Sequence, residues 1–161
     1  MPASRGTWLW LAGGGLFAAM AAGALYVAWP LLNPAVVATA PLDPQCDLRQ
    51  GPCTTVLPDG GRVRLGLAPS TLPLLEPLAI EVRLDGLRAF AVEVDFAGVD
   101  MNMGYNRPRL AAEGEGRYVG NTVLPVCVRQ RMDWEARVLV RTPDGLMAEP
   151  FRFSTYNGKG G

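Results

Sequence analysis

The chain has 161 residues, with 15 basic and 15 acidic side chains and no histidine. Its formal charge of zero gives no electrostatic reason to expect a nucleic-acid partner. The lack of histidine removes the usual general base near neutral pH and the commonest protein ligand for zinc, copper(II) and haem iron. Length and composition therefore predict one domain of ordinary size and disfavour most enzyme mechanisms.

The first predicted element is an apolar helix. From Trp8 to Trp29 the chain carries no charge, and as a helix this run would be about 33 Å long, which matches the hydrocarbon core of a bilayer. Tryptophan and tyrosine stand near its ends, where interfacial aromatic residues belong. Arg5 is the only charge ahead of the run, so the positive-inside rule places residues 1–7 in the cytoplasm. We therefore predict a single-pass transmembrane helix over 8–29.

A cleaved signal peptide is the alternative interpretation of the same run. Residues 37–40 read Val-Ala-Thr-Ala, which resembles a cleavage site, but the apolar run is longer than the core of a usual signal peptide. Pro41 would follow the cut directly, and signal peptidase avoids such sites. The sequence favours the retained anchor, and the proline- and alanine-rich residues 30–45 predict an extended spacer.

Beyond residue 45, apolar and polar residues alternate with the period of strands, which predicts sheets with one buried face. The clearest runs are 78–84, 90–96 (with Phe90 on its apolar face) and 134–140, and shorter candidates are 63–67, 118–124 and 151–155. Turn-forming proline, aspartate and glycine fall between them. We predict an all-β, immunoglobulin-like antiparallel β-sandwich of about seven strands over residues 46–156, outside the membrane, followed by a flexible tail over 157–161.

If this topology holds, the three cysteines lie in an oxidising compartment, where disulfides can form. Cys46 and Cys53 lie seven positions apart, and the aspartate, glycine and proline between them can turn the chain back on itself. A Cys46–Cys53 disulfide would join the end of the spacer to the first strand of the domain. A bridge from either cysteine to Cys127, or three unpaired thiols, are the alternatives that the sequence leaves open.

Two methionines, Met101 and Met103, stand one residue apart in the polar stretch DMNMGYN. At positions i and i+2 they would project to one face of an extended backbone. With the thiol of Cys127 they form a set of soft donors, and soft donors select copper(I) over the harder divalent ions. Plain packing of two apolar side chains is the alternative, and residue types alone favour packing.

Five short pieces of the chain occur in order between Val63 and Phe153: VEVDF, DMNMG, GEGRYVG, MDWEARVLV and PDG. Together they resemble the FixH and YtkA-like domains, small β-sandwiches often tethered by one N-terminal membrane helix. The resemblance implies a role in haem-copper oxidase assembly or periplasmic copper handling, with a copper chaperone or an oxidase subunit as partner. It brings the copper(I) and packing interpretations close to balance. Because the chain has no histidine, no histidine ligand of such relatives can be transferred to it.

Together with the resemblance, these observations predict an accessory protein that is anchored in a bacterial inner membrane and has a periplasmic domain. It is not an enzyme, and it binds copper(I) and assists metalloenzyme assembly. The serines and Cys127 have no histidine partner, so the usual nucleophile–base pairs are missing and no catalytic residue is proposed. A domain that holds a membrane complex together without metal is the alternative function.

Overall fold

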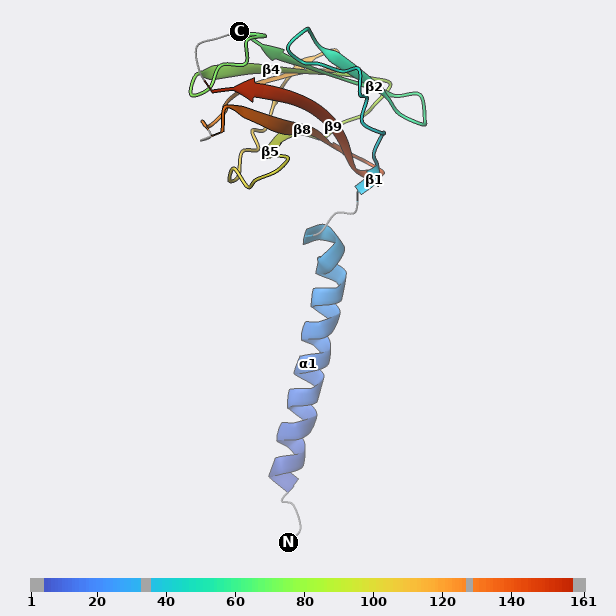
Figure 1. The fold of residues 1–161 in the computed structure, drawn as a ribbon. Helices are drawn as coiled ribbons and strands as arrows, with labels where there is room; N and C mark the ends of the chain where they lie inside the picture. Colours follow the sequence, from blue (N-terminus) through green and yellow to red (C-terminus); the bar gives the residue numbers. More distant parts are fainter. Residues whose placement is uncertain (1–4, 33–35, 127–128, 158–161) are drawn as a thin grey trace. The chain divides into compact units, whose positions relative to one another are not determined.

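The chain divides into a helical N-terminal unit and a β-rich unit, as a computed structural model shows (Figure 1). The structure describes residues 5–32, 36–126 and 129–157, and within these ranges only the backbone of residues 5–12, 30–32, 37 and 38. The β-rich unit begins at Val36, ahead of the boundary near Cys46 that the sequence predicts.

The N-terminal unit is a helix, α1 (Arg5–Leu32), with no charged residue in its last turn. Its apolar residues are spread around the helix instead of forming one stripe. The large apolar side chains described in it are exposed: Leu16, Phe17, Met20, Leu25, Tyr26, Val27 and Trp29. Among the described side chains of the chain, no helical stretch combines the length and the hydropathy that a membrane crossing requires.

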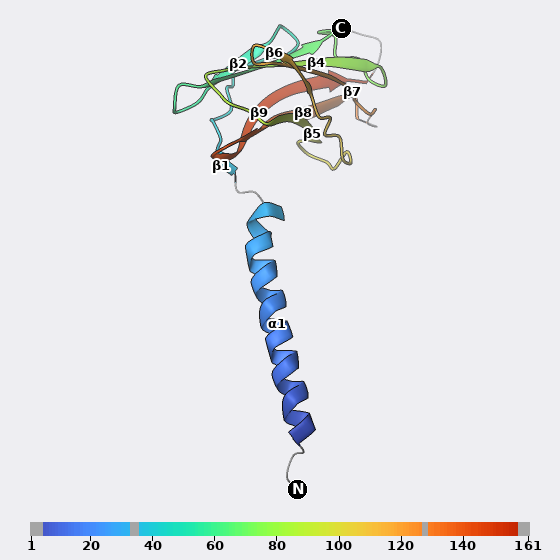
Figure 2. The same cartoon turned by 180° about the vertical axis from the view of Figure 1, so that it is seen from behind.

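Within residues 36–126 and 129–157, the β-rich unit contains two sheets that lie face to face (Figure 1, Figure 2). The four-stranded sheet has the order β1-β9-β8-β5 and the five-stranded sheet the order β2-β3-β4-β7-β6. The strands are β1 (Val36–Ala38), β2 (Cys53–Val56), β3 (Arg62–Ala68), β4 (Pro77–Asp85), β5 (Ala91–Gly98), β6 (Ala111–Gly114), β7 (Arg117–Val123), β8 (Arg131–Thr142) and β9 (Gly145–Tyr156). The predicted all-β sandwich is confirmed, with short edge strands in addition to the predicted runs.

The core lies between the two sheets because burial alternates along the long strands. On β4 the buried side chains are those of Leu78, Ile80, Val82 and Leu84, at every second position. Trp134 on β8 and Phe96 on β5 are the largest fully buried side chains of the described chain. Phe153 on β9 packs against both, with ring centroids 6.3 and 6.4 Å away. Such aromatic burial is a major contribution to the stability of the sandwich.

Phe90 departs from the predicted alternation. It is 73% exposed, whereas Val92 and Val94 behind it are fully buried. Because β5 begins only at Ala91, Phe90 precedes the strand and does not share its inward face. The prediction that Phe90 belongs to the apolar face is wrong.

Part of the predicted spacer belongs to the β-rich unit. Strand β1 pairs in parallel with β9, with Val36 opposite Leu146. Ala40 is buried, and its amide nitrogen donates a 3.0 Å hydrogen bond to Oε2 of Glu149 on β9. Residues 36–40 therefore contact the last strand of the domain before the chain enters β2.

Candidate functional site

The predicted metal residues Met101 and Met103 lie in the loop that follows β5, residues 99–105, here called the methionine loop. Beyond it, residues 106–110 run back along the outer edge of β5. The amides of Phe96 and Val94 donate hydrogen bonds of 2.9 and 3.1 Å to the carbonyl oxygens of residues 106 and 108. Because these bonds satisfy the backbone of an edge strand, they hold the loop at the end of the four-stranded sheet.

The methionine loop is also fixed by side-chain hydrogen bonds. Oδ1 of Asn102 accepts a 2.8 Å bond from the amide of Gly104, whose φ of +83° is the left-handed conformation that favours glycine. Asn106 reaches the other sheet, where its Nδ2 donates to the carbonyl oxygen of Val123 at 3.1 Å. Its Oδ1 accepts a 2.7 Å bond from the hydroxyl of Thr122. The segment that directly follows the methionine loop is thus tied to β7 as well as to β5.

Gly98, the last residue of β5, lies beside the two predicted methionines. Met101 and Met103 are half-buried and pack against the core. A Cβ at position 98 would lie 3.1 Å from Cγ of Met103 and 2.5 Å from the carbonyl oxygen of Met101. It would lie closer still to Cε of Met132, a buried residue of β8. The missing side chain of Gly98 therefore lets two methionine side chains and the loop backbone meet at one place.

Met132 is a candidate residue that the sequence-based site omits. It stands two positions before Trp134, and the alternation of β8 places both side chains on the inward face. That parity is the signal in the sequence that could have found it. Met101, Met103 and Met132 are here called the methionine cluster.

Cys127, the third predicted donor, lies outside the described residues. Arg129 is described, and its Nη1 lies 3.7 Å from Oδ2 of Asp100 in an exposed ion pair. The chain at residue 129 therefore reaches the start of the methionine loop.

No group of three or more histidine, cysteine, aspartate or glutamate residues that could hold a metal ion occurs among the described residues. Thioether sulfur, an uncharged and soft donor, is a different kind of metal ligand. The methionine cluster offers such donors for copper(I). The contacts of these methionines with the core also fit the alternative interpretation, in which they only pack.

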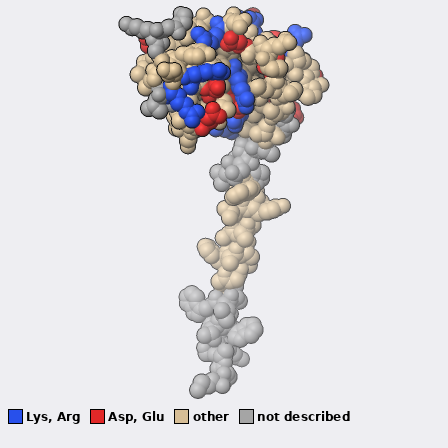
Figure 3. All heavy atoms as spheres, viewed as in Figure 1, with Lys and Arg blue, Asp and Glu red and all other residues tan. Residues whose placement is uncertain are grey.

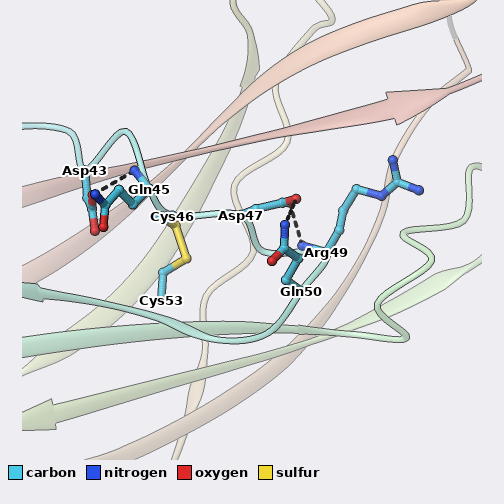
Figure 4. The surroundings of a disulfide bond; sticks show 7 residues. All are labelled: Asp43, Gln45, Cys46, Asp47, Arg49, Gln50 and Cys53. Atoms are coloured by element: carbon cyan, nitrogen blue, oxygen red, sulfur yellow. Dashed lines mark hydrogen bonds between the residues drawn. A yellow bond between two sulfur atoms is a disulfide. The ribbon is translucent and has the colours of Figure 1, made fainter.

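The Cys46–Cys53 disulfide that the spacing favours is present, with Cα atoms 5.7 Å apart (Figure 4). Inside the closed loop, Oδ1 of Asp47 accepts a 3.0 Å hydrogen bond from the amide of Arg49, which forms a turn. Leu48 between them is buried in the core. The disulfide and the buried side chain of Leu48 together hold the segment ahead of β2 against the sandwich.

A carboxyl group lies inside the core at the other end of the sheet. Glu149 is fully buried, and within the described residues its Oε1 has no hydrogen-bond partner. Burial raises the pKa of Glu149 above its ordinary value, and the hydrogen bond from Ala40 opposes this only in part. The sequence analysis does not include it, although it stands at the same parity as the inward-facing Phe151 and Phe153.

Comparisons of the chain with protein-family models, with curated proteins and with solved structures found no match. The resemblance to FixH and YtkA-like domains stays a prediction from sequence motifs. A function has to be inferred from the residues of this chain.

Proposed function

We propose that this protein is a membrane-anchored periplasmic accessory protein whose immunoglobulin-like β-sandwich binds copper(I) at the methionine cluster. In this role it assists the assembly of a haem-copper oxidase or another metalloenzyme, with a copper chaperone or an oxidase subunit as partner. The observation that carries the proposal is the convergence of Met103 and Met132 on Gly98, beside the backbone of Met101.

The chemistry of copper(I) matches these residues. Copper(I) is a soft ion that binds neutral thioether sulfur, so its site does not need histidine. Asn106, directly after the methionine loop, is hydrogen-bonded to both sheets, and a donor set held by a rigid scaffold loses less entropy when it binds an ion. Cys127 is proposed as a further sulfur donor, because the ion pair of Arg129 with Asp100 draws a neighbouring part of its segment to the loop.

The proposed membrane anchor is supported by the uncharged run over residues 8–29 and by the exposed apolar side chains around α1. A helix that is apolar on all sides suits a lipid surrounding. The proposed periplasmic location of the sandwich fits the disulfide between Cys46 and Cys53, because disulfides persist in oxidising compartments.

Competition with a copper(I) chelator, on the full chain in detergent micelles, tests the proposed site. The wild-type chain is expected to withdraw copper(I) from the chelator. The double variant Met101→Leu/Met103→Leu should bind at least about tenfold more weakly, because leucine keeps the volume but removes the soft donor.

Met147→Leu is the matched control, because it changes a buried methionine of β9 outside the cluster. It should keep the wild-type affinity. Unchanged affinity in the double variant, or a wild-type chain that binds no copper(I), would contradict the proposal. A separate Cys127→Ser variant reports whether the thiol contributes to the affinity.

A role in holding a complex together without metal is the second candidate function. The observation that favours it is a hollow lined by arginines on the outer face of the five-stranded sheet. This face and the methionine cluster use different residues, so the two functions are compatible.

A further inference from the structure

The outer face of the five-stranded sheet carries a hollow of about 770 Å³. Its floor contains small residues on neighbouring strands, among them Gly66 and Ala68 on β3 and Ala79 on β4. Ala68 and Ala79 are exposed, point away from the core and carry no large side chain into the space above the sheet. Pro52 covers Gly66, where an added Cβ would lie 3.3 Å from its Cγ. The backbone of another chain can therefore approach this floor closely.

Three arginines stand directly opposite one another beside the hollow. Arg64 on β3 pairs with Arg83 on β4, and Arg83 pairs with Arg117 on β7. Like charges at directly opposed positions destabilise a sheet. The fold does not require this row, and a local conflict of this kind is expected where a surface has a function.

Acidic residues neutralise only part of this charge. Glu81 accepts hydrogen bonds of 2.8 Å from Arg83 and 2.9 Å from Arg117, and these guanidinium groups, Arg83 first, hold the pKa of Glu81 below its usual range. Arg64 and Arg109 also line the hollow. Throughout residues 5–32, 36–126 and 129–157, neither of these two arginines has a carboxylate within ion-pair distance.

The outer face of the four-stranded sheet is charged in a different way. Basic and acidic side chains gather together on it, over β8 and β9 (Figure 3). Glu135 lies 2.8 Å from the guanidinium of Arg137 and 3.5 Å from that of Arg152. Arg107 and Asp95 form another pair at 3.1 Å. These groups satisfy one another, so this face offers few charges to a partner.

We propose that the hollow on the five-stranded sheet binds an extended, acidic segment of a partner protein. A guanidinium group is a planar fork that binds a carboxylate through two parallel hydrogen bonds. Arg64 and Arg109 supply two such forks that the described chain leaves without a carboxylate, and the small residues between strands leave room for the backbone of the segment. This binding goes beyond the proposed copper(I) site and does not depend on it.

An anionic membrane surface fits this face less well than a peptide. A bilayer surface is broad and cannot enter a recess in a sheet. Glu81 and Glu113 also line the hollow, and they would repel a continuous layer of phosphate groups. A peptide can place its carboxylates at Arg64 and Arg109 and keep them away from the two glutamates.

Fluorescence polarisation tests this proposal with a labelled peptide of alternating glutamate and serine, added to the full chain in neutral detergent micelles. The peptide should bind, and its affinity should fall as salt is raised. Arg64→Gln/Arg109→Gln should weaken binding at least about tenfold, because two charge-assisted contacts are lost. A peptide with glutamine in place of glutamate should not bind.

Arg137→Gln/Arg152→Gln is the matched control, because it removes the same charge from the opposite face. It should keep the wild-type affinity. Arg64→Lys/Arg109→Lys keeps the charge without the planar fork and should give an intermediate affinity, and it replaces the glutamine variant if thermal unfolding shows that variant to be unfolded.

Equal losses of peptide affinity in Arg64→Gln/Arg109→Gln and in the control Arg137→Gln/Arg152→Gln would overturn the proposal, because they would indicate general charge attraction. A wild-type chain that does not bind the acidic peptide would overturn the proposal as well. Vesicles of phosphatidylglycerol and phosphatidylcholine form the last arm. Vesicle binding that needs Arg64 and Arg109, with no peptide binding, would assign the face to lipid and reject the peptide.

Discussion

The two ends of the four-stranded sheet bury similar side chains in different surroundings. At the methionine end, Met132 is 4% exposed, and the indole Nε1 of Trp134 donates a 2.9 Å hydrogen bond to the hydroxyl of Thr155. At the glutamate end, Met147 is 5% exposed, but Oε1 of Glu149 has no partner among the described residues. The buried polar groups are therefore paired at one end and incompletely paired at the other.

Burial of a methionine therefore does not by itself make it a candidate ligand. Met132 faces Gly98, where Met103 and the methionine loop also converge. Met147 instead shares a surface depression with Leu87 and the β8–β9 turn. What faces the sulfur decides whether the residue has a possible role beyond packing. Substitutions at the two ends test whether this contrast holds.

The largest effect is expected at the glutamate end, as a dependence of stability on pH. Burial raises the pKa of Glu149 in the folded state above its ordinary value of 4.5. The folded state therefore holds the proton more tightly, and stability is lost as pH rises from the ordinary value through the raised one. Within that window the wild-type chain should lose about 1.4 kcal/mol of unfolding free energy per pH unit through this group.

Glu149→Gln has the shape of the protonated side chain and does not titrate, so it should lack this pH-dependent loss. Urea unfolding of both chains across mildly acidic to mildly alkaline pH measures the difference. Parallel stability curves for the two chains would show that Glu149 has no raised pKa, and the contrast between the two ends would then disappear.

The next effect is expected at the glycine that faces the methionine cluster. An added methyl group in Gly98→Ala meets the backbone oxygen of Met101, which cannot rotate away, so we expect a loss of about 2 kcal/mol. In Gly61→Ala, at the glutamate end, the nearest atom is Cδ2 of Leu87 at 2.8 Å, the flexible end of a side chain. Thermal unfolding should show a smaller loss of stability for Gly61→Ala than for Gly98→Ala. Equal losses would mean that the backbone of the methionine loop can shift to make room for the added methyl group.

Much of the fold could be predicted because the long strands have one face on the core. The alternation from Leu78 to Leu84 lies in β4, and that from Trp134 to Val140 lies in β8. Strand β1 could not be found in this way. It has three residues in a proline-rich stretch, and its partner β9 is the last strand of the domain, so no local pattern records the pairing.

The candidate sites depend on which strands lie side by side. Spacing along the chain was enough to group Met101 with Met103. Met132 joins them only because β5 pairs with β8, with Gly98 opposite Trp134. The row of arginines on the other sheet likewise requires the register of three strands. Periodicity within one strand shows which face is buried, but it does not show which strand is its neighbour.

A smaller effect is expected from the buried hydrogen bond at the methionine end. Thr155→Val keeps the shape of the side chain but removes the acceptor of the indole Nε1 of Trp134, which is fully buried. Leaving this donor unpaired should cost about 1.5 kcal/mol in unfolding free energy. Chemical unfolding measures the loss, with Thr122→Val as a comparison at a hydroxyl that donates to Asn106. If Thr155→Val leaves the unfolding free energy unchanged, the indole has another acceptor in the variant.

The smallest effect on stability is expected when each end loses its buried sulfur. Met132→Leu and Met147→Leu conserve volume, and their similar burial predicts similar losses, each below about 1.5 kcal/mol. Copper(I) affinity should separate them, because only Met132 belongs to the methionine cluster. Chelator competition and thermal unfolding, run on the same preparations, give both quantities. If neither variant changes the affinity while Met101→Leu/Met103→Leu does, the loop methionines bind the ion and Met132 only packs beneath them. If both variants weaken binding equally, the loss reflects a general loosening of the core, and the two ends do not differ in the way proposed.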